Sequence, residues 1–127
     1  MEEDEERIVA SVEGDDDYGL LIGKRGQTID ALQLLCFQAA FRGMRERKRV
    51  IVDAAGYRER RRETLTARAD RAAEQALNGE RRVSMDAMSA QERRVVHEHL
   101  KERAGVETYS EGDEPSRCVV VAPLVSE

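Results

Sequence analysis

The sequence is poor in aromatic residues: among its 127 residues there are no tryptophans, two phenylalanines and three tyrosines. Sheets of the RRM and OB types stack bases on exposed aromatic rings, so a stacking platform of that kind is not expected here. No apolar run approaches the roughly 20 residues that a membrane-spanning helix needs. Residues 2–6 are all acidic, the opposite of the basic start of a signal peptide. We therefore expect a soluble, cytoplasmic protein without membrane insertion.

Cysteine and histidine are equally scarce, with two of each. Cys36 and Cys118 have neither metal-ligand spacing nor the setting of a small disulfide-rich domain, so we expect both to be reduced packing residues. His97 and His99 are two positions apart on a predicted helix and face different directions, which disfavours a metal site. No nucleophile–base motif accompanies them. We expect no cofactor, no metal and no enzymatic activity.

The formal net charge of −5 by itself disfavours a nucleic-acid partner. Its distribution is uneven, however. Residues 1–17 hold nine acids and one base, residues 107–127 hold five acids and one base, and the middle, residues 18–106, holds twelve acids and nineteen bases. Because exposed charges more than roughly 10 Å apart are largely screened at physiological salt, this basic middle can attract phosphates locally. An ordinary solvated surface is the alternative.

Hydrophobic periodicity predicts two mixed halves, with Gly56 as the plausible boundary. Alternating apolar residues predict strands, and apolar residues at three- and four-residue steps predict helices. In the first half we expect a strand at 7–13, an acidic turn at 15–17, a helical turn at 18–22, a long helix at 28–43 and a strand at 48–54. In the second half we expect a helix at 57–77, an extended piece at 82–85, a helix from 90 to about 103 and strands at 107–110 and 117–122. Ser89 and Glu92 form a predicted capping box.

The most informative stretch is Gly23-Lys24-Arg25-Gly26, directly before the first long helix. Glycine permits backbone conformations closed to other residues and lets a sugar-phosphate chain approach the main chain. The amides and the positive dipole end of the following helix favour an anion, and two cations lie within the loop. Such a loop can clamp four nucleotides. A plain glycine turn between two helices is the alternative. The candidate contact residues are Ile22, Gly23, Lys24, Arg25, Gly26, Gln27, Thr28 and Ile29, where the isoleucines, with Leu32, floor a groove or belong to the core.

A second candidate is the pair Arg93 and His97, four residues apart on one face of a predicted helix, close to Val96 and Leu100. The pair can hold a phosphate or a base edge between its side chains, or it can brace the helix against the sheet. Both alternatives stay open. Further basic residues would complete a track for a nucleic acid: Arg42, Arg45, Arg58, Arg61, Arg62 and Arg94.

The order of these motifs resembles the Jag family, the SpoIIIJ-associated proteins of bacteria, over residues 8–123. The matching segments are LIGKRG at 21–26, DAAGYR at 53–58, MSAQERRVVH at 88–97, and SEGDEP at 110–115 followed by Arg117. Members of that family join a KH domain to an Arg-x-x-x-His domain that binds single-stranded nucleic acids. The helix and strand that usually open a bacterial-type KH domain are not apparent before Arg7, where we expect only an acidic tail. The chain is therefore a short member or part of a longer protein.

The resemblance implies an α+β fold, with a KH-like β-α-α-β unit at residues 1–55 and a small α-β-α-β-β domain at residues 56–127. It implies single-stranded RNA binding by the Gly23-Lys24-Arg25-Gly26 loop, with a second basic surface around Arg93 and His97. It also implies a regulatory link to the bacterial cell envelope, division or sporulation. The expected partners are single-stranded RNA and either another KH protein or a second copy of the chain. The alternative is a protein–protein interaction module whose arginines only keep its surface solvated.

Overall fold

The computed structural model describes residues 1–13, 19–44 and 47–124. The acidic turn predicted at 15–17 and the basic residue Arg45 lie outside the described residues. The chain divides into two compact units, Met1–Glu59 and Arg60–Glu127, which are described separately below. Within the described ranges, no helix is both long enough and apolar enough to cross a membrane.

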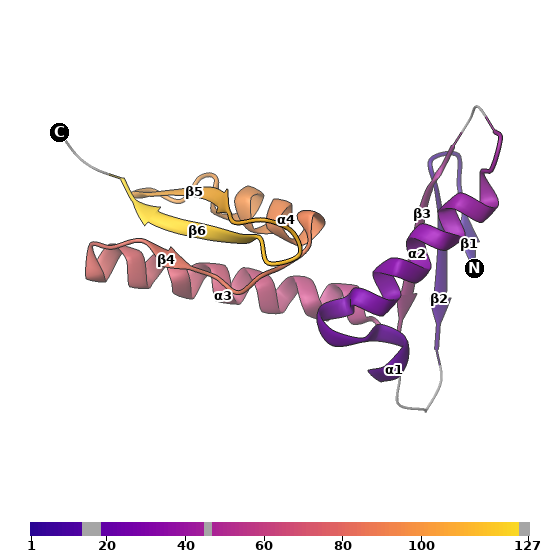
Figure 1. Cartoon of the computed structure of the whole chain (residues 1–127), viewed down its shortest axis with the longest axis horizontal. Coiled ribbons are helices and arrows are strands. Elements are labelled where there is room, and N and C mark those ends of the chain that lie inside the picture. The colour runs from indigo at the N-terminus through magenta and orange to yellow at the C-terminus, as the bar shows by residue number, and fades with distance from the viewer. Residues whose placement is uncertain (14–18, 45–46, 125–127) are drawn as a thin grey trace. The chain divides into compact units, whose positions relative to one another are not determined.

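The first unit has the predicted β-α-α-β order, preceded by one additional short strand (Figure 1). Its elements are β1 (Glu2–Glu3), β2 (Arg7–Val12), α1 (Gly19–Ile22), the 3-10 turn η1 (Lys24–Gly26), α2 (Gln27–Ala40) and β3 (Arg49–Ala54). The sheet order is β1-β2-β3. Strands β2 and β3 are parallel, with Ile8 opposite Val50, because the two helices form the crossover that joins them.

Strand β1 differs from the prediction, which took the residues before Arg7 as an acidic tail. Glu2 and Glu3 pair antiparallel with β2. The Asp4 carboxylate closes the turn by accepting hydrogen bonds from the amides of Glu6 and Arg7, at 2.7 and 2.8 Å. These two hydrogen bonds lower the pKa of Asp4. Because this pairing uses only backbone groups at the edge of a sheet, no apolar alternation in the sequence signals it.

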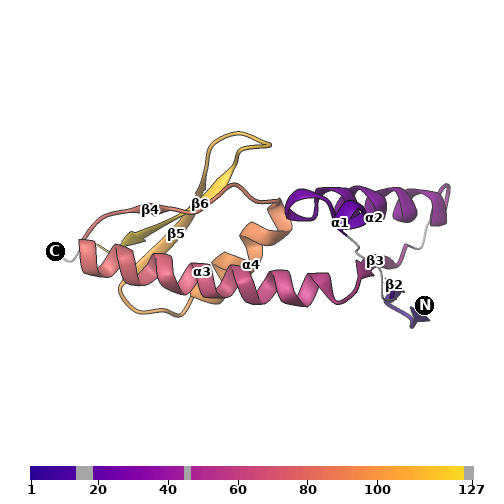
Figure 2. The same ribbon diagram turned by 90° about the horizontal axis from the view of Figure 1, so that it is seen from below.

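The core of the first unit lies between its sheet and the long helix α2, which covers one face of that sheet (Figure 2). Alternate residues of β3 face this helix, as the period of two requires. The fully buried members of the core are Ile29, Phe41, Val50, Val52 and Ala54. Partly buried side chains of α1, α2 and the first turn after β3 pack around them, Tyr57 among these.

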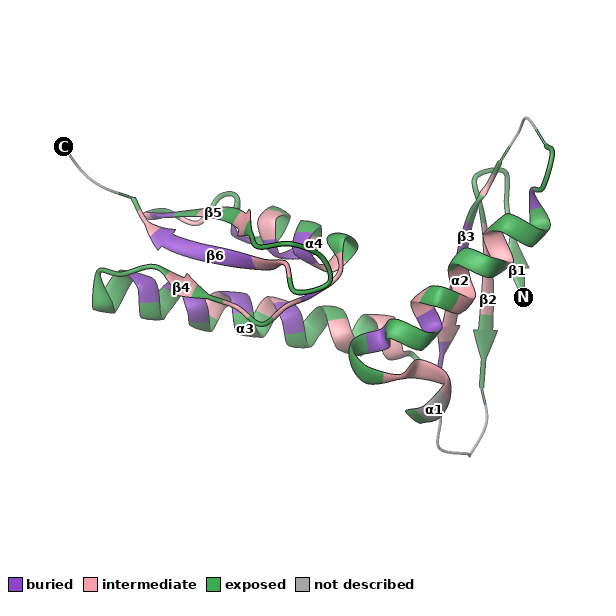
Figure 3. Cartoon of the chain, in the orientation of Figure 1, coloured by how far each residue is buried: buried purple, intermediate pink, exposed green. Residues whose placement is uncertain are grey.

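The second unit has the predicted α-β-α-β-β order. Its elements are α3 (Tyr57–Gly79), which begins within the first unit, β4 (Val83–Ser84), α4 (Ala90–Leu100), β5 (Val106–Glu111) and β6 (Cys118–Pro123). The sheet is antiparallel with the order β4-β6-β5. A stripe of small residues on α3 and the apolar face of α4 pack against the central strand β6, which is buried along most of its length (Figure 3).

The helix boundaries in the second unit follow the predicted signals. The Ser89 side chain accepts a hydrogen bond from the Glu92 amide, and the Glu92 carboxylate accepts one from the Ser89 amide, so the capping box is confirmed. Helix α3 ends at Gly79, and the next residue, Glu80, is left-handed with φ 51°. Both cysteines are free, as expected, and each is half-buried.

Candidate nucleic-acid interface

The Gly23–Gly26 loop of the first unit turns the chain from α1 into α2 through left-handed backbone conformations. Gly23, Arg25 and Gly26 have φ values of 73°, 55° and 77°. Gly26 is the N-cap of α2 and has no side chain with which to cap the helix. In the first turn, therefore, only backbone groups are on hand for the amides: the Gly26 amide donates to the Gly23 carbonyl at 3.3 Å, and the Gln27 amide donates to the Lys24 carbonyl.

The outer side of the loop is exposed and positive. Lys24, Arg25, Gln27 and Thr28 are all exposed to solvent, whereas Gly26 is buried beneath them. The positive end of a helix dipole, uncapped by any side chain, and two flexible cations favour an anionic ligand such as a phosphate. The loop predicted from sequence therefore has the exposure and the charge that phosphate binding requires.

The inner side of the loop is closely packed. A Cβ atom on Gly26 would lie 2.7 Å from the hydroxyl oxygen of Tyr57, and a Cβ on Gly23 would lie 2.3 Å from Oγ1 of Thr28. Ile22 and Leu32 are half-buried against the core, and Ile29 is 0% exposed. The side chain of Ile29 therefore supports the loop from within the core and presents no surface to a ligand.

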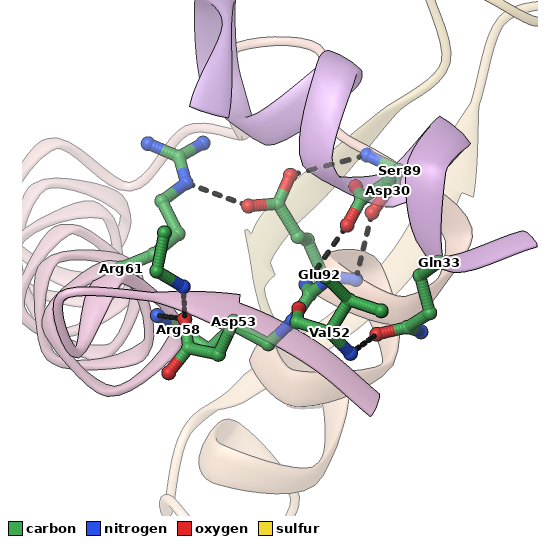
Figure 4. A network of polar contacts seen from close by, with 9 residues as sticks. Asp30, Gln33, Val52, Asp53, Arg58, Arg61, Ser89 and Glu92 are labelled. Atoms are coloured by element: carbon green, nitrogen blue, oxygen red, sulfur yellow. Dashed lines mark hydrogen bonds and ion pairs between the residues drawn. The ribbon is translucent and has the colours of Figure 1, made fainter. Parts of the chain in front are cut away.

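Arg58 has partners inside the first unit. Its Nε donates to the Val52 carbonyl at 2.7 Å, and its Nη1 pairs with Asp30 on the first turn of α2 at 2.8 Å (Figure 4). The amide of Val52 donates to the side-chain oxygen of Gln33 at 2.9 Å. The hydrogen bonds at Val52 thus come from side chains at the edge of the sheet. Arg58 accordingly holds β3 and α2 together.

Arg61 has a partner inside the second unit. Its Nε lies 2.6 Å from Oε2 of Glu92, the acidic member of the α4 capping box, and both side chains are largely buried (Figure 4). This ion pair joins α3 to the start of α4. The neighbouring residue Arg62 is exposed.

Arg93 is the buried charged residue of the second unit's described core, with 8% of its surface exposed. Its Nη1 donates to the Met88 carbonyl at 2.7 Å, and its Nη2 donates to Glu114 Oε1 at 2.6 Å. The guanidinium thereby ties α4 to the segment before it and to the loop between β5 and β6. Of the two alternatives left open by the sequence, this geometry favours the brace.

His97 is held by two hydroxyl groups of β5. Its Nδ1 lies 2.7 Å from Thr108 Oγ1, and its Nε2 lies 3.0 Å from Ser110 Oγ. In the neutral imidazole one nitrogen donates and the other accepts, and a hydroxyl group satisfies either role. Partial burial, and then the nearby charge of Arg93, lower the pKa of His97. His97 therefore also links α4 to the sheet.

The remaining predicted basic residues are exposed. Arg62 lies on α3, Arg42 follows the end of α2, and Arg94 pairs with Glu98 one turn along α4 at 3.1 Å with 80% of its side chain exposed. The described part of the chain contains no group of three or more His, Cys, Asp or Glu residues that could hold a metal ion.

Sequence reasoning missed the contacts of Tyr57 with Gly26 and of Asp30 with Arg58. Neither partner lies near the other in the sequence, since Asp30 and Arg58 are separated by 28 positions. The nearest available signal was the segment 53–58, which contributed to the family resemblance without suggesting a role.

Comparison with known proteins gives the class of each unit. Residues 1–53 match the family model described as "KhpA/KhpB, KH domain", and residues 63–123 match the model of the Arg-x-x-x-His domain. The fold and the motifs thus define a protein with a KH domain followed by an Arg-x-x-x-His domain. The chain belongs to the KhpB family, also called Jag, which confirms the resemblance.

Three relatives, each named "RNA-binding protein KhpB", illustrate the similarity. The protein from Clostridium symbiosum is 40% identical over 120 residues, covering 94% of this chain and 54% of the relative. The protein from Bacillus subtilis is 39% identical over 105 residues, covering 81% and 50%. The protein from Lactiplantibacillus plantarum is 40% identical over 104 residues, covering 82% and 32%. The chain thus spans about half or less of these relatives. Neither domain model describes an enzyme, in agreement with the prediction that the chain is not one.

Proposed function

We propose that this chain binds single-stranded RNA and that the Gly23–Gly26 loop grips the sugar-phosphate backbone. The observation that carries the proposal is the combination of exposed Lys24 and Arg25 with a glycine N-cap that leaves the first turn of α2 without a side-chain cap. The names of the relatives and the KH domain model support it.

Within this proposal the fourteen predicted site residues have different roles. The residues proposed to contact RNA are Gly23, Lys24, Arg25, Gly26, Gln27 and Thr28 in the first unit and Arg62 and Arg94 in the second. The residues proposed to support them are Ile22, Ile29, Arg58, Arg61, Arg93 and His97. The division follows their exposure and their internal partners. We also propose that residues 1–55 and 56–127 act as the two RNA-binding domains.

The partner proposed for the first unit is a second KH domain, either of another KH protein or of a second copy of this chain. Leu34 and Leu35 on the outer face of α2 are 56% and 62% exposed, and Met44 beyond the helix is 56% exposed. Neighbouring exposed apolar side chains on one helix are typical of an interaction site. The matched domain model covers both KhpA and KhpB, which supports a KH partner.

We place the protein in the cytoplasm, in keeping with an RNA ligand. A regulatory link to cell envelope, division or sporulation is part of the same proposal, and it rests on the family.

A fluorescence titration with a short single-stranded RNA and with its duplex tests the proposed function. We expect the single strand to bind more tightly, since a KH loop clamps an unpaired strand. The double variant Lys24→Asp, Arg25→Asp should weaken this binding at least tenfold more than Arg42→Asp, Arg47→Asp does. Both double variants change the charge equally within the first unit, so the comparison separates the loop from general electrostatics. Equal losses, or no binding by the unmodified chain, would favour the protein–protein interaction module.

A further inference from the structure

The segment 53–58 (DAAGYR) forms the turn from β3 into α3, and the RNA grip does not account for it. The Asp53 carboxylate accepts hydrogen bonds from the amides of Ala54 and Arg58, at 2.9 and 3.1 Å. Between them, Ala55 and Gly56 are left-handed, with φ values of 51° and 68°. This turn returns Tyr57 to the core of the first unit.

The Tyr57 ring lies against the side of Gly26 where a side chain would project. A Cβ atom there would be 2.7 Å from the Tyr57 hydroxyl oxygen and 2.9 Å from Cε1, closer than real Cβ contacts. Gly26 is the left-handed N-cap of α2, and glycine alone does not fix that conformation, because it populates many others equally well. The ring therefore removes space that Gly26 would otherwise explore.

The next residue acts on the same helix. Arg58 pairs with Asp30 at 2.8 Å, one turn after Gly26, and its Nε is anchored on the Val52 carbonyl. The first turn of α3 thus contacts both the N-cap and the first turn of α2.

We propose that Tyr57 is a positioning residue for the Gly23–Gly26 loop, with the Arg58–Asp30 pair holding the adjoining turn. Tyr57 holds the inner side of Gly26, so that the first-turn amides and the side chains of Lys24 and Arg25 keep the arrangement that a nucleotide strand meets. This inference rests on the proposed RNA binding for its functional consequence. Its structural part, an ordered loop, can be measured without RNA.

The test compares Tyr57→Ala, Tyr57→Leu and Tyr57→Phe in the full chain. Nitrogen-15 relaxation of the Gly23–Thr28 amides in the free protein should show a more mobile loop in the Ala and Leu variants and an unchanged loop in the Phe variant, which keeps the ring. Affinity for a short single-stranded RNA should fall at least tenfold in the first two variants and stay within twofold in the third. The Leu variant keeps the core filled if the Ala variant does not fold.

Phe41→Leu is the matched control. Phe41 belongs to the same core but follows the other end of α2. We expect this substitution to lower the melting temperature while loop mobility and RNA affinity stay as in the unmodified chain. A purely structural role for Tyr57 would make its variants behave like this control.

A double-mutant cycle tests the contact itself. Gly26→Ala should lower the melting temperature more in the unmodified chain than in the Tyr57→Leu background, where the ring no longer clashes with the new methyl group. Additive effects would overturn the contact. An ordered loop in Tyr57→Leu, or equal effects of Phe41→Leu, would overturn the positioning role. If the unmodified chain binds no RNA, the proposed function fails, while relaxation and the cycle still decide the positioning role.

Discussion

Arg61 and Glu92 form an ion pair of 2.6 Å in which the side chains are only 16% and 13% exposed. The next residue, Arg62, points into solvent. Two adjacent arginines of one helix thus differ in role, because successive residues of a helix are about 100° apart around its axis. One stabilises the second unit, and the other is available to a ligand.

Arg61→Ala should destabilise the second unit by about 3 kcal/mol, because it leaves the Glu92 carboxylate largely buried without its cation. Arg62→Ala should change stability by less than about 0.5 kcal/mol, as is usual for an exposed residue. Chemical denaturation followed by circular dichroism measures both. Equal effects of the two substitutions would contradict the assigned roles.

The sequence placed these arginines on a helix but could not distinguish them. The partners of Arg58, Arg61 and Arg93 lie 28, 31 and 21 positions away, so their contacts arise only when the chain folds. Exposure on a helix follows local periodicity, whereas the choice between a buried ion pair and an exposed cation depends on which carboxylate the tertiary fold brings near.

The stability of the chain should fall as the pH drops below the ordinary His97 pKa of 6.5. Because the folded state lowers this pKa, the unfolded state binds more protons between the two values, so stability is fully present above about 6.5 and is lost as the pH falls through the folded-state value. Thermal melts at pH 7.5 and 5.5 should show a smaller loss for His97→Gln than for the unmodified chain. The His99–Asp70 contact is common to both proteins and cancels. An identical loss in the two proteins would count against this effect of His97.

Leu35→Asp should abolish association with a second KH domain while leaving the fold intact, because Leu35 is 62% exposed. Sedimentation velocity of the chain alone, and mixed with a separate KH protein, measures association. Gln38→Asp, an exposed substitution one turn further along α2, is the matched control for added charge. Undiminished association of the Leu35 variant would remove this face as the interface.

The salt dependence of RNA binding should report the loss of loop cations. Each phosphate neutralised on a single strand contributes about 0.7 to the slope of log K against log salt concentration. Lys24→Ala with Arg25→Ala should therefore reduce the slope by about 1.4. Titrations at four salt concentrations give this slope. An unchanged slope with reduced affinity would mean that the two cations act through the fold.

Strands and helices with clear apolar periods were predictable, and so were the glycine loop and the capping box, because each depends on neighbouring residues. Strand β1 was not, since Glu2 and Glu3 pair only through their backbones at a sheet edge. The inner packing of the loop was not predictable either. Tyr57 follows the next strand, and nothing in the spacing of residues 26 and 57 shows that they meet.

The most direct test of the central claim is the shift of backbone amide resonances in a nitrogen-15-labelled chain titrated with a short single-stranded RNA. We predict that the largest shifts fall on Gly23 to Thr28, because the loop and the first turn of α2 carry the exposed cations and uncapped helix start. Saturation with RNA while these resonances stay unmoved, and others in the second unit shift, would contradict the claim that this loop grips the strand.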